Sequence, residues 1–301
     1  MRSVTRKIET LRRATAESRL QARPETLKRL LDNDVPKKDI LPIARAAGVM
    51  AAKKTPDLLP YCHPLTIDWV EIEFDVQESL IIVRAVVEAV AKTGVEMEAL
   101  TAVSVASLTI YDMLKPIDKE IEILNTKLVQ KTGGKSSFIE KIPVGFKAAV
   151  IVTSDSTSKG MRSDKSGRLI EDRLKSLGVE SRYIIIPDEK ALIMSTIREC
   201  CEEGASLIVT TGGTGLGPRD VTVEATEAVI DRQIPGVMEA ARDYGQRRTP
   251  YAMLSRGLAG QKGRTLIVNL PGSSKGTEES LDAIFPSLLH AYKMMGGASH
   301  D

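Results

Sequence analysis

The chain has 301 residues, of which 42% are hydrophobic, so it is long enough to bury the cores of two ordinary domains. Lys and Arg total 42 and Asp and Glu total 40, and the resulting net charge of +2 gives no general reason to expect nucleic acid or an anionic membrane as a partner. The three cysteines match neither a disulfide framework nor a four-ligand zinc spacing, which favours a reducing compartment.

The N-terminal segment, residues 1–13, is rich in Arg, but it has no apolar signal core and contains Glu9, which disfavours a targeting peptide. The most apolar stretch, residues 80–90, is interrupted by Arg84 and Glu88. It falls far short of the roughly 20 apolar residues of a membrane-spanning helix. We therefore expect a soluble, cytoplasmic protein without a membrane partner.

Three stretches of the first half have helical spacing: residues 24–31, 39–54 and 95–114. Residues 70–76 alternate apolar and acidic side chains, and residues 80–89 alternate again after a polar turn, so together they predict a β-hairpin. A further alternating stretch covers residues 119–124. This mixture predicts an α+β domain, an antiparallel sheet with helices, and we expect a ferredoxin-like fold.

After Lys147 the pattern changes to short apolar runs followed by helical segments, which is typical of a parallel sheet with helical crossovers. The apolar runs are residues 148–152, 183–186, 207–210 and 265–268. Helices are predicted over residues 169–177, 191–203 and 223–230. The second half is therefore predicted to be an α/β domain with a mainly parallel sheet. We expect two domains, residues 1–143 and 144–301.

The long helix of the first half carries a candidate acid and base. Steps of three and four residues place Glu98, Asp112 and Lys115 on one stripe. Asp112 and Lys115 are one turn apart, so they can meet at the helix end and each can shift the pKa of the other. The alternative is a surface ion pair without a catalytic role.

Lysines before and after the helices are candidates for phosphate binding. Lys131 precedes Gly133 and Gly134, and glycines let a backbone approach a phosphate closely while lysines supply the charge for a triphosphate. A solvated turn is the alternative. His63 is either a ligand or acid, or a core residue, and the sequence has no second His nearby to complete a metal site.

Polar or glycine-rich segments follow the apolar runs of the second half, and in an open parallel sheet such ends share one crevice. The segments are residues 153–156, 187–188, 211–215 and 269–274. The glycines of residues 212–215 either present backbone N–H groups to a phosphate or form a structural turn. Asp188 and Asp220 either hold Mg²⁺ against nucleotide phosphates or serve as local caps, and Asp220 could instead pair with Arg219.

Five ungapped motifs cover much of the first half: AAKKT (51–55), LPYCHPL (59–65), KTGVEMEALTA (92–102), LTIYDMLK (108–115) and KTGGKS (131–136). They resemble the cyclic pyranopterin monophosphate synthase family (MoaC type). The resemblance implies rearrangement of 3′,8-cyclo-7,8-dihydro-GTP to cyclic pyranopterin monophosphate, with release of pyrophosphate and without a cofactor. It implies Asp112 as acid or base and Lys115 as its partner. The implied substrate-binding residues are Lys37, Lys53, Tyr61, Cys62, His63, Met97, Glu98 and Lys131.

Four motifs of the second half are PDE (187–189), TTGGTG (210–215), PRDVT (218–222) and NLPG (269–272). They resemble the molybdopterin-binding domain family, which includes molybdopterin adenylyltransferases of the MogA and MoaB types. The resemblance implies that Asp188 and Asp220 are catalytic and bind Mg²⁺ together with ATP. The implied binding residues for molybdopterin or nucleotide are Gly212, Gly213, Thr214, Gly215, Asn269, Gly272 and Ser273.

Taken together, the two resemblances predict a bifunctional enzyme of molybdenum cofactor biosynthesis that acts on pterin and nucleotide substrates. They also imply a homo-oligomer, a trimer or a hexamer. An alternative is an active synthase fused to a non-catalytic molybdopterin-binding or oligomerisation module, and another is a scaffold with neither site working. A dinucleotide-dependent dehydrogenase is disfavoured, because no Gly-x-Gly-x-x-Gly follows the first apolar run of the second half.

Overall fold

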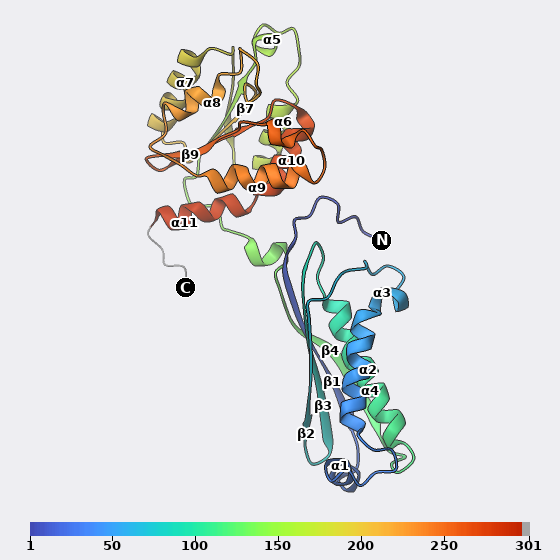
Figure 1. Ribbon diagram of the computed structural model, residues 1–301. Coiled ribbons are helices and arrows are strands. Elements are labelled where there is room, and N and C mark those ends of the chain that lie inside the picture. Colours follow the sequence, from blue (N-terminus) through green and yellow to red (C-terminus); the bar gives the residue numbers. More distant parts are fainter. Residues whose placement is uncertain (297–301) are drawn as a thin grey trace. The chain divides into compact units, whose positions relative to one another are not determined.

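The computed structural model describes residues 1–296, which form two compact units divided between Phe138 and Ile139 (Figure 1). The division lies a few residues before the boundary expected between residues 143 and 144. Each unit has a hydrophobic core of its own.

The first unit is built on a four-stranded antiparallel sheet with the order β2-β3-β1-β4. Its strands are β1 (Thr10–Gln21), β2 (Trp69–Val76), β3 (Leu80–Ala91) and β4 (Glu122–Thr132). The predicted hairpin of β2 and β3 is confirmed. Strand β1 was not predicted, although it is an inner strand that pairs with β3 on one side and β4 on the other. Its small and charged side chains give no clear apolar alternation.

The helices of the first unit include the three that were predicted. They are α1 (Pro24–Leu31), α2 (Ile40–Lys53), α3 (Thr55–Leu58) and α4 (Glu96–Leu114), and a 3-10 turn follows at Lys135–Phe138. Helices α2 and α4 lie side by side against the sheet (Figure 1). By length and composition α4 could cross a membrane, but Ala99, Ala102 and Ala106 are completely buried, as expected for the core helix of a soluble fold.

The second unit contains a six-stranded sheet with the order β6-β5-β7-β10-β9-β8. Its strands are β5 (Ala148–Thr153), β6 (Ser181–Ile186), β7 (Leu207–Thr211), β8 (Arg232–Gln233), β9 (Ala259–Lys262) and β10 (Thr265–Leu270). The neighbouring strands β6, β5, β7 and β10 pair in parallel, which confirms the predicted mainly parallel sheet. The antiparallel edge made by β9 and β8 was not predicted.

Helices cover both faces of this sheet, because alternate residues of β5 belong to two separate core clusters. The helices are α5 (Asp155–Ser158), α6 (Ser166–Ser176), α7 (Lys190–Glu202), α8 (Thr222–Glu227), α9 (Pro235–Gln246), α10 (Ser274–Ile284) and α11 (Ala291–Met295), with 3-10 turns η2 (Ala252–Leu254) and η3 (Ser287–His290). Helices α9 and α10 were not predicted, and the helix predicted over residues 223–230 ends at Glu227. Burial on both faces explains the uninterrupted apolar runs.

Close packing of α2 against α4 depends on Gly48. A Cβ atom at this position would lie 2.5 Å from Ile72 Cδ1 and 2.9 Å from the carbonyl oxygen of Ala102. We expect Gly48→Ala to destabilise the first unit by about 1–3 kcal/mol, because overpacking forces the backbone to move. Trp69 in β2 is the single tryptophan, so urea unfolding followed by its fluorescence reports this unit.

The matched control is Gly236→Ala in α9, where an added Cβ would meet nothing within 4 Å in residues 1–296 apart from its chain neighbours and the backbone of its own helix. The control should leave the Trp69 transition where it is. An unchanged midpoint for Gly48→Ala would contradict the packing argument.

Candidate functional site

Three charged side chains meet at the C-terminal end of α4. An oxygen of Asp112 lies 2.6 Å from Lys115 Nζ, and the other lies 2.8 Å from Lys37 Nζ. Hydrogen bonds from Lys115 and then Lys37 lower the pKa of Asp112 to about 2, and Asp112 raises the pKa of Lys115. The predicted meeting of acid and base is confirmed, and at neutral pH the trio holds an ionised carboxylate between two cations.

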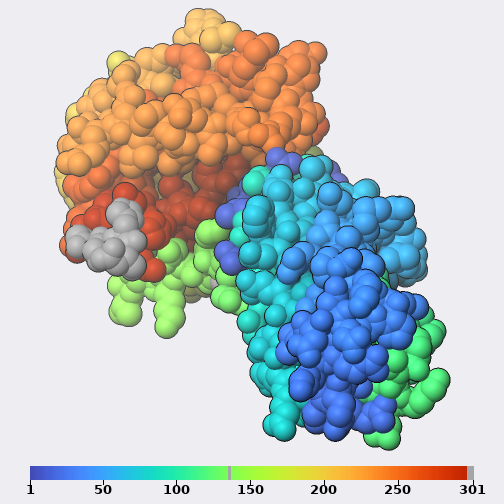
Figure 2. Space-filling view, turned by 60° about the horizontal axis from the view of Figure 1, so that its bottom comes forward, coloured from blue at the N-terminus to red at the C-terminus, as the bar shows by residue number. Residues whose placement is uncertain are grey.

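The loop between α1 and α2 presents Lys37 to this cluster. Its backbone takes left-handed conformations at Asn33 and Asp39, with φ of 49° and 57°. Lys38 donates to the carbonyl oxygen of Asn33 at 2.6 Å and so points back into the loop, while Lys37 reaches Asp112. In the space-filling view the dark-blue part of the chain, which includes α1, lies at the surface of the first unit (Figure 2).

A second group of expected residues lies at the N-terminal end of α4. Glu98 is only 1% exposed, and its Oε1 accepts a hydrogen bond from Cys62 Sγ at 3.4 Å. Its Oε2 is buried without a partner in residues 1–296. Burial raises the pKa of Glu98, and burial together with the Glu98 charge raises the pKa of Cys62 to about 11. The pair therefore presents a neutral thiol and a spare acceptor oxygen.

Lys131 borders a basic cavity of about 540 Å³ near this end of α4, which we call the Arg12 cavity. Lys131 Nζ lies 3.0 Å from Glu96 Oε1, and buried Arg12 donates to the carbonyl oxygen of Ala91 at 3.1 Å. The cavity is lined by Arg2, Ser3, Lys7, Arg12, Arg13, Thr93, Gly94, Glu96, Lys131, Thr132, Gly134 and Ser137. Arg12 and Arg13 were not predicted as site residues, since β1 was not predicted, and neither was Lys7, which precedes that strand.

The two groups are far apart within one copy of the chain. About 21 Å of helix separates Glu98 from Asp112, because an α-helix rises 1.5 Å per residue. Lys37 belongs to the Asp112 end. Helix α2 runs antiparallel to α4, since Gly48 packs on Ala102 while Lys37, just before α2, reaches Asp112. Lys53 therefore ends α2 on the Glu98 side. One copy does not bring all the expected substrate residues together.

In the second unit, the segments after β5, β7 and β10 border a cavity of about 360 Å³, which we call the Ser154 cavity. Of the expected residues, Gly212, Gly272 and Ser273 line it, together with cationic Arg162 and Lys165. Gly212 has φ of 100° and Gly213 has φ of 61°. A Cβ atom on either glycine would collide with Thr153 or Thr222, so packing alone already demands glycine here.

Asn269, another expected binding residue, is fully buried. Its Nδ2 donates to Thr210 Oγ1 at 2.8 Å and to Thr226 Oγ1 at 2.9 Å, which ties β10 to β7 and α8. Asn269 is not among the residues that line the Ser154 cavity. Its observed contacts are structural.

Asp188 lies at the carboxyl end of β6 and pairs with Asp155, which follows β5. The Asp155 amide donates to Asp188 Oδ2 at 3.0 Å, and the Asp188 amide donates to Asp155 Oδ1 at 3.2 Å. Arg219 Nη2 lies 2.6 Å from Asp155 Oδ2. Burial, helped by the charges of Asp155 and Asp220, raises the pKa of Asp188, and its Oδ1 is buried with no partner in the described chain. Asp155 was not predicted as a site residue, although it follows a strand just as Asp188 does.

Asp220 caps its own turn, because its Oδ2 accepts a hydrogen bond from the Gly217 amide at 2.7 Å. Within residues 1–296, no group of three or more His, Cys, Asp and Glu side chains could hold a metal ion. The acidic side chains near this edge suit Mg²⁺ that arrives with phosphate oxygens, since that ion needs only one or two protein carboxylates. The unpartnered Asp188 Oδ1 is the oxygen that fits such a role.

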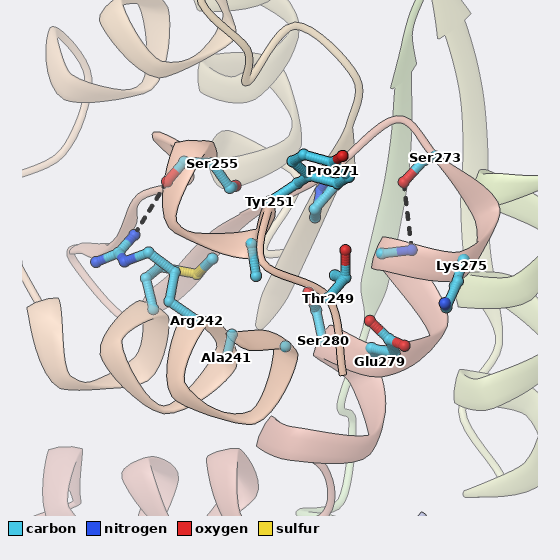
Figure 3. A pocket seen from close by; sticks show the side chains of 14 residues that line it. Ala241, Arg242, Thr249, Tyr251, Ser255, Pro271, Ser273, Lys275, Glu279 and Ser280 are labelled. Atoms are coloured by element: carbon cyan, nitrogen blue, oxygen red, sulfur yellow. Dashed lines mark hydrogen bonds between the residues drawn. The ribbon is translucent and has the colours of Figure 1, made fainter. Parts of the chain in front are cut away.

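A further cavity of about 400 Å³, the Tyr251 cavity, lies between α9, η2 and the start of α10 (Figure 3). Its lining combines an apolar floor with hydroxyl and charged groups: Met238, Ala241, Arg242, Gly245, Thr249, Tyr251, Ala252, Ser255, Pro271, Ser273, Lys275, Gly276, Glu279 and Ser280. Ser273 lines this cavity and the Ser154 cavity, so the two adjoin. The Tyr251 cavity was not predicted, because neither α9 nor η2 was predicted.

Comparisons with known proteins agree with the division of the chain into two units. The profile of the MoaC family matches residues 1–134, and that of a domain described as "Probable molybdopterin binding domain" matches residues 149–290. A "Molybdenum cofactor biosynthesis bifunctional protein" of Chlorobaculum tepidum is 42% identical over 301 residues, covering 100% of this chain and 96% of that protein.

Shorter relatives match each unit separately. A "Cyclic pyranopterin monophosphate synthase" of Roseiflexus sp. is 54% identical over 138 residues, covering 45% of this chain and 87% of the relative. A crystal structure of the molybdopterin biosynthesis enzyme MoaB from Thermus thermophilus is 44% identical, with a TM-score of 0.48, and covers 52% of this chain and 99% of that one.

The contact between Cys62 and Glu98 leads to a test by alkylation. We expect Glu98→Gln to lower the pKa of Cys62, because it removes the negative charge that disfavours the thiolate. Alkylation of Cys62 by iodoacetamide at pH 8.5 should then become faster by roughly 3-fold or more. Peptide mass spectrometry gives the rate for each cysteine, and Cys200, whose pKa burial raises to about 11, is the internal control. Equal Cys62 rates in the two proteins would contradict the assigned contact.

Proposed function

The chain belongs to the family of bifunctional molybdenum cofactor biosynthesis proteins, and we propose that each of its two units catalyses one reaction. The first unit is a cyclic pyranopterin monophosphate synthase, and the second adenylylates molybdopterin with ATP. The relationship to a bifunctional protein over the whole chain carries this proposal. The fold class assigned to the first unit is ferredoxin-like, and the strand order β2-β3-β1-β4 with helices between β1 and β2 and between β3 and β4 supports it.

In the first unit the substrate is proposed to be 3′,8-cyclo-7,8-dihydro-GTP. The cations of the Arg12 cavity suit its triphosphate. The β- and γ-phosphates leave together as pyrophosphate, and the α-phosphate stays in the cyclic monophosphate. The spare Glu98 Oε2 suits an N–H of the base, because a buried acceptor without a partner is costly until a ligand fills it. Asp112 accepts a proton and Lys115 donates one during the rearrangement. The proposal assigns no cofactor to this unit.

We propose a homo-oligomer, a trimer or a hexamer, and the separation of these groups supports an assembly of more than one copy. The Arg12 cavity and Glu98 lie at one end of α4, and Asp112 with its two lysines lies at the other, about 21 Å along the helix. A single substrate must contact both groups if both act in one reaction. We therefore propose that each synthase site combines the Glu98 end of one copy with the Asp112 end of another.

Mixing inactive variants tests the shared site. Asp112→Asn and Lys131→Met should each abolish synthase activity alone, and co-refolding them should restore about a quarter of the wild-type rate, because mixed pairs contain one intact site. Formation of cyclic pyranopterin monophosphate is measured by chromatography. The matched control mixes Asp112→Asn with Lys115→Met, which remove groups from the same end and should stay inactive. Recovery in neither mixture, or the same recovery in both, would contradict the shared site.

In the second unit we propose that the nucleotide phosphates bind in the Ser154 cavity and molybdopterin in the Tyr251 cavity. Arg162 and Lys165 suit the phosphates, and Ser273 lies on both cavities, where the two substrates would meet. The terminal phosphate oxygen of molybdopterin attacks the α-phosphorus of ATP, the new P–O bond forms, and pyrophosphate leaves. Asp188 and Asp220 would hold Mg²⁺, which neutralises phosphate charge when bound.

One observation favours the second candidate, a non-catalytic molybdopterin-binding module. Asp220 Oδ2 is already used by the Gly217 amide, so the carboxylate has a structural role in this state. The cap and the catalytic charge can be separated by substitution, because Asn keeps an acceptor oxygen and loses the charge.

We expect Asp220→Asn to lower the rate of molybdopterin adenylylation on the order of 10²-fold, with the fold retained. Purified protein is incubated with molybdopterin and Mg·ATP, and the adenylylated product is measured by chromatography. Asp220→Ala, which removes the cap as well, is the comparison. Full activity of Asp220→Asn would reduce Asp220 to a structural cap. If the wild type binds molybdopterin but forms no product, the second unit is a non-catalytic molybdopterin-binding module.

We also propose a cytoplasmic location. Cys62, Cys200 and Cys201 are all free thiols, as expected in a reducing compartment. Both proposed reactions use small pterin and nucleotide substrates, and neither requires a nucleic acid or a membrane partner.

A further inference from the structure

We propose that Arg256 is a positioning residue that connects the wall of the Tyr251 cavity to the loop carrying Asp220, so that molybdopterin and ATP bind cooperatively. The inference rests on the proposed function of the second unit. Arg256 lies outside the motifs selected from the sequence, and residues 255–257 make the contacts that connect the two sites.

Arg256 holds the Asp220 loop at both ends. Its backbone amide donates to the carbonyl oxygen of Thr214 at 3.0 Å, and its Nε donates to that of Gly215 at 2.7 Å. Its Nη2 donates to the carbonyl oxygen of Asp220 at 2.8 Å. These three bonds hold residues 214–220 in position, including the backbone of Asp220.

The same guanidinium is anchored on α8. Arg256 Nη1 forms a short ion pair with Glu224 Oε1, and this contact lowers the pKa of Glu224. Glu224 Oε2 is buried, and none of residues 1–296 supplies it with a donor. A planar guanidinium can donate in three directions at once, which the single ammonium of a lysine cannot do with the same geometry. Arg256 is thus a rigid bridge between the loop and α8.

The residues on either side of Arg256 contact the wall of the Tyr251 cavity. Ser255 lines the Tyr251 cavity, and Arg242, which also lines it, donates to the carbonyl oxygens of Ser255 and Gly257 at 3.5 and 3.2 Å (Figure 3). A Cβ on Gly257 would lie 2.6 Å from the carbonyl oxygen of Asn269, so the segment is pressed against β10. Residues 255–257 therefore have little room to move independently of the cavity wall.

Coupling follows from this arrangement. A ligand that contacts Ser255 or Arg242 restricts the motion of residues 255–257. Because Arg256 is hydrogen-bonded to the Asp220 loop, the motion of that loop beside the phosphate site is restricted as well. By thermodynamic reciprocity, ATP must then strengthen the binding of molybdopterin by the same factor. The coupling is carried by a continuous series of hydrogen bonds and packed backbone.

The test uses calorimetry to compare the affinity of the full-length protein for the Mg²⁺ complex of α,β-methylene-ATP with and without saturating molybdopterin. This analogue cannot release pyrophosphate, so the ternary complex does not react during the measurement. In the wild type we expect molybdopterin to tighten ATP binding about 5-fold or more, the range of ordinary allosteric coupling. Arg256→Lys should reduce this factor toward 1 while each ligand alone keeps its affinity within about 3-fold. A merely structural arginine would instead weaken both separate affinities and leave the factor unchanged.

The matched control is Arg182→Lys, since Arg182 also bridges two partners, Glu199 and Glu203, away from both cavities. It should keep the wild-type coupling. If Arg256→Lys does not fold, Glu224→Gln keeps the three loop bonds and loosens only the anchor, and coupling should fall partially.

The outcomes distinguish a failure of the proposed function from a failure of the role given to Arg256. A wild type that binds neither ligand overturns the proposed function, and this inference with it. A wild type that binds both ligands without coupling overturns the inference alone. Full coupling in folded Arg256→Lys and Glu224→Gln proteins, or its loss in Arg182→Lys, would also overturn the role of Arg256.

Discussion

The length of one buried helix is the constraint on which the chemistry of the first unit depends. Helix α4 is held in the core by Ala99, Ala102 and Ala106, which are fully buried, and Gly48 brings α2 directly against it. A helix packed in this way cannot shorten the distance between Glu98 and Asp112. Charged groups placed at its two ends must therefore serve different sites or sites shared between copies, and a single reaction requires the second arrangement.

Both units leave a buried carboxylate oxygen unpaired at the position where a ligand is proposed. Glu98 Oε2 in the first unit and Asp188 Oδ1 in the second have no partner in the part of the chain that the structure describes. Leaving such an atom buried costs free energy, typically about 1–3 kcal/mol, so a fold that keeps it gains when a donor or cation arrives. In each case burial raises the pKa of the carboxyl group. The shared feature is a preformed acceptor, reached through two unrelated folds.

In the second unit, hydrogen bonds to backbone carbonyl groups help to hold the loop that carries Asp220. The loop of residues 212–220 is shaped by glycines that pack on Thr153 and Thr222 and by the donors of Arg256. Asp220 is positioned by the Gly217 amide. A site built on such a loop is rigid where it contacts the sheet, and the Tyr251 and Ser154 cavities can influence each other through it.

The sequence determined the features that depend on neighbours along the chain. Alternation revealed the β2–β3 hairpin, apolar runs revealed the parallel strands, and a spacing of three residues brought Asp112 to Lys115. Only the tertiary structure decided that Lys131 lies with Glu96 and not with Asp112, that Asp155 pairs with Asp188, and that β1 brings Arg12 to a cavity. The physical reason is that periodicity records which face of an element is buried. Which distant elements share that burial depends on long-range packing, and no local pattern carries this information.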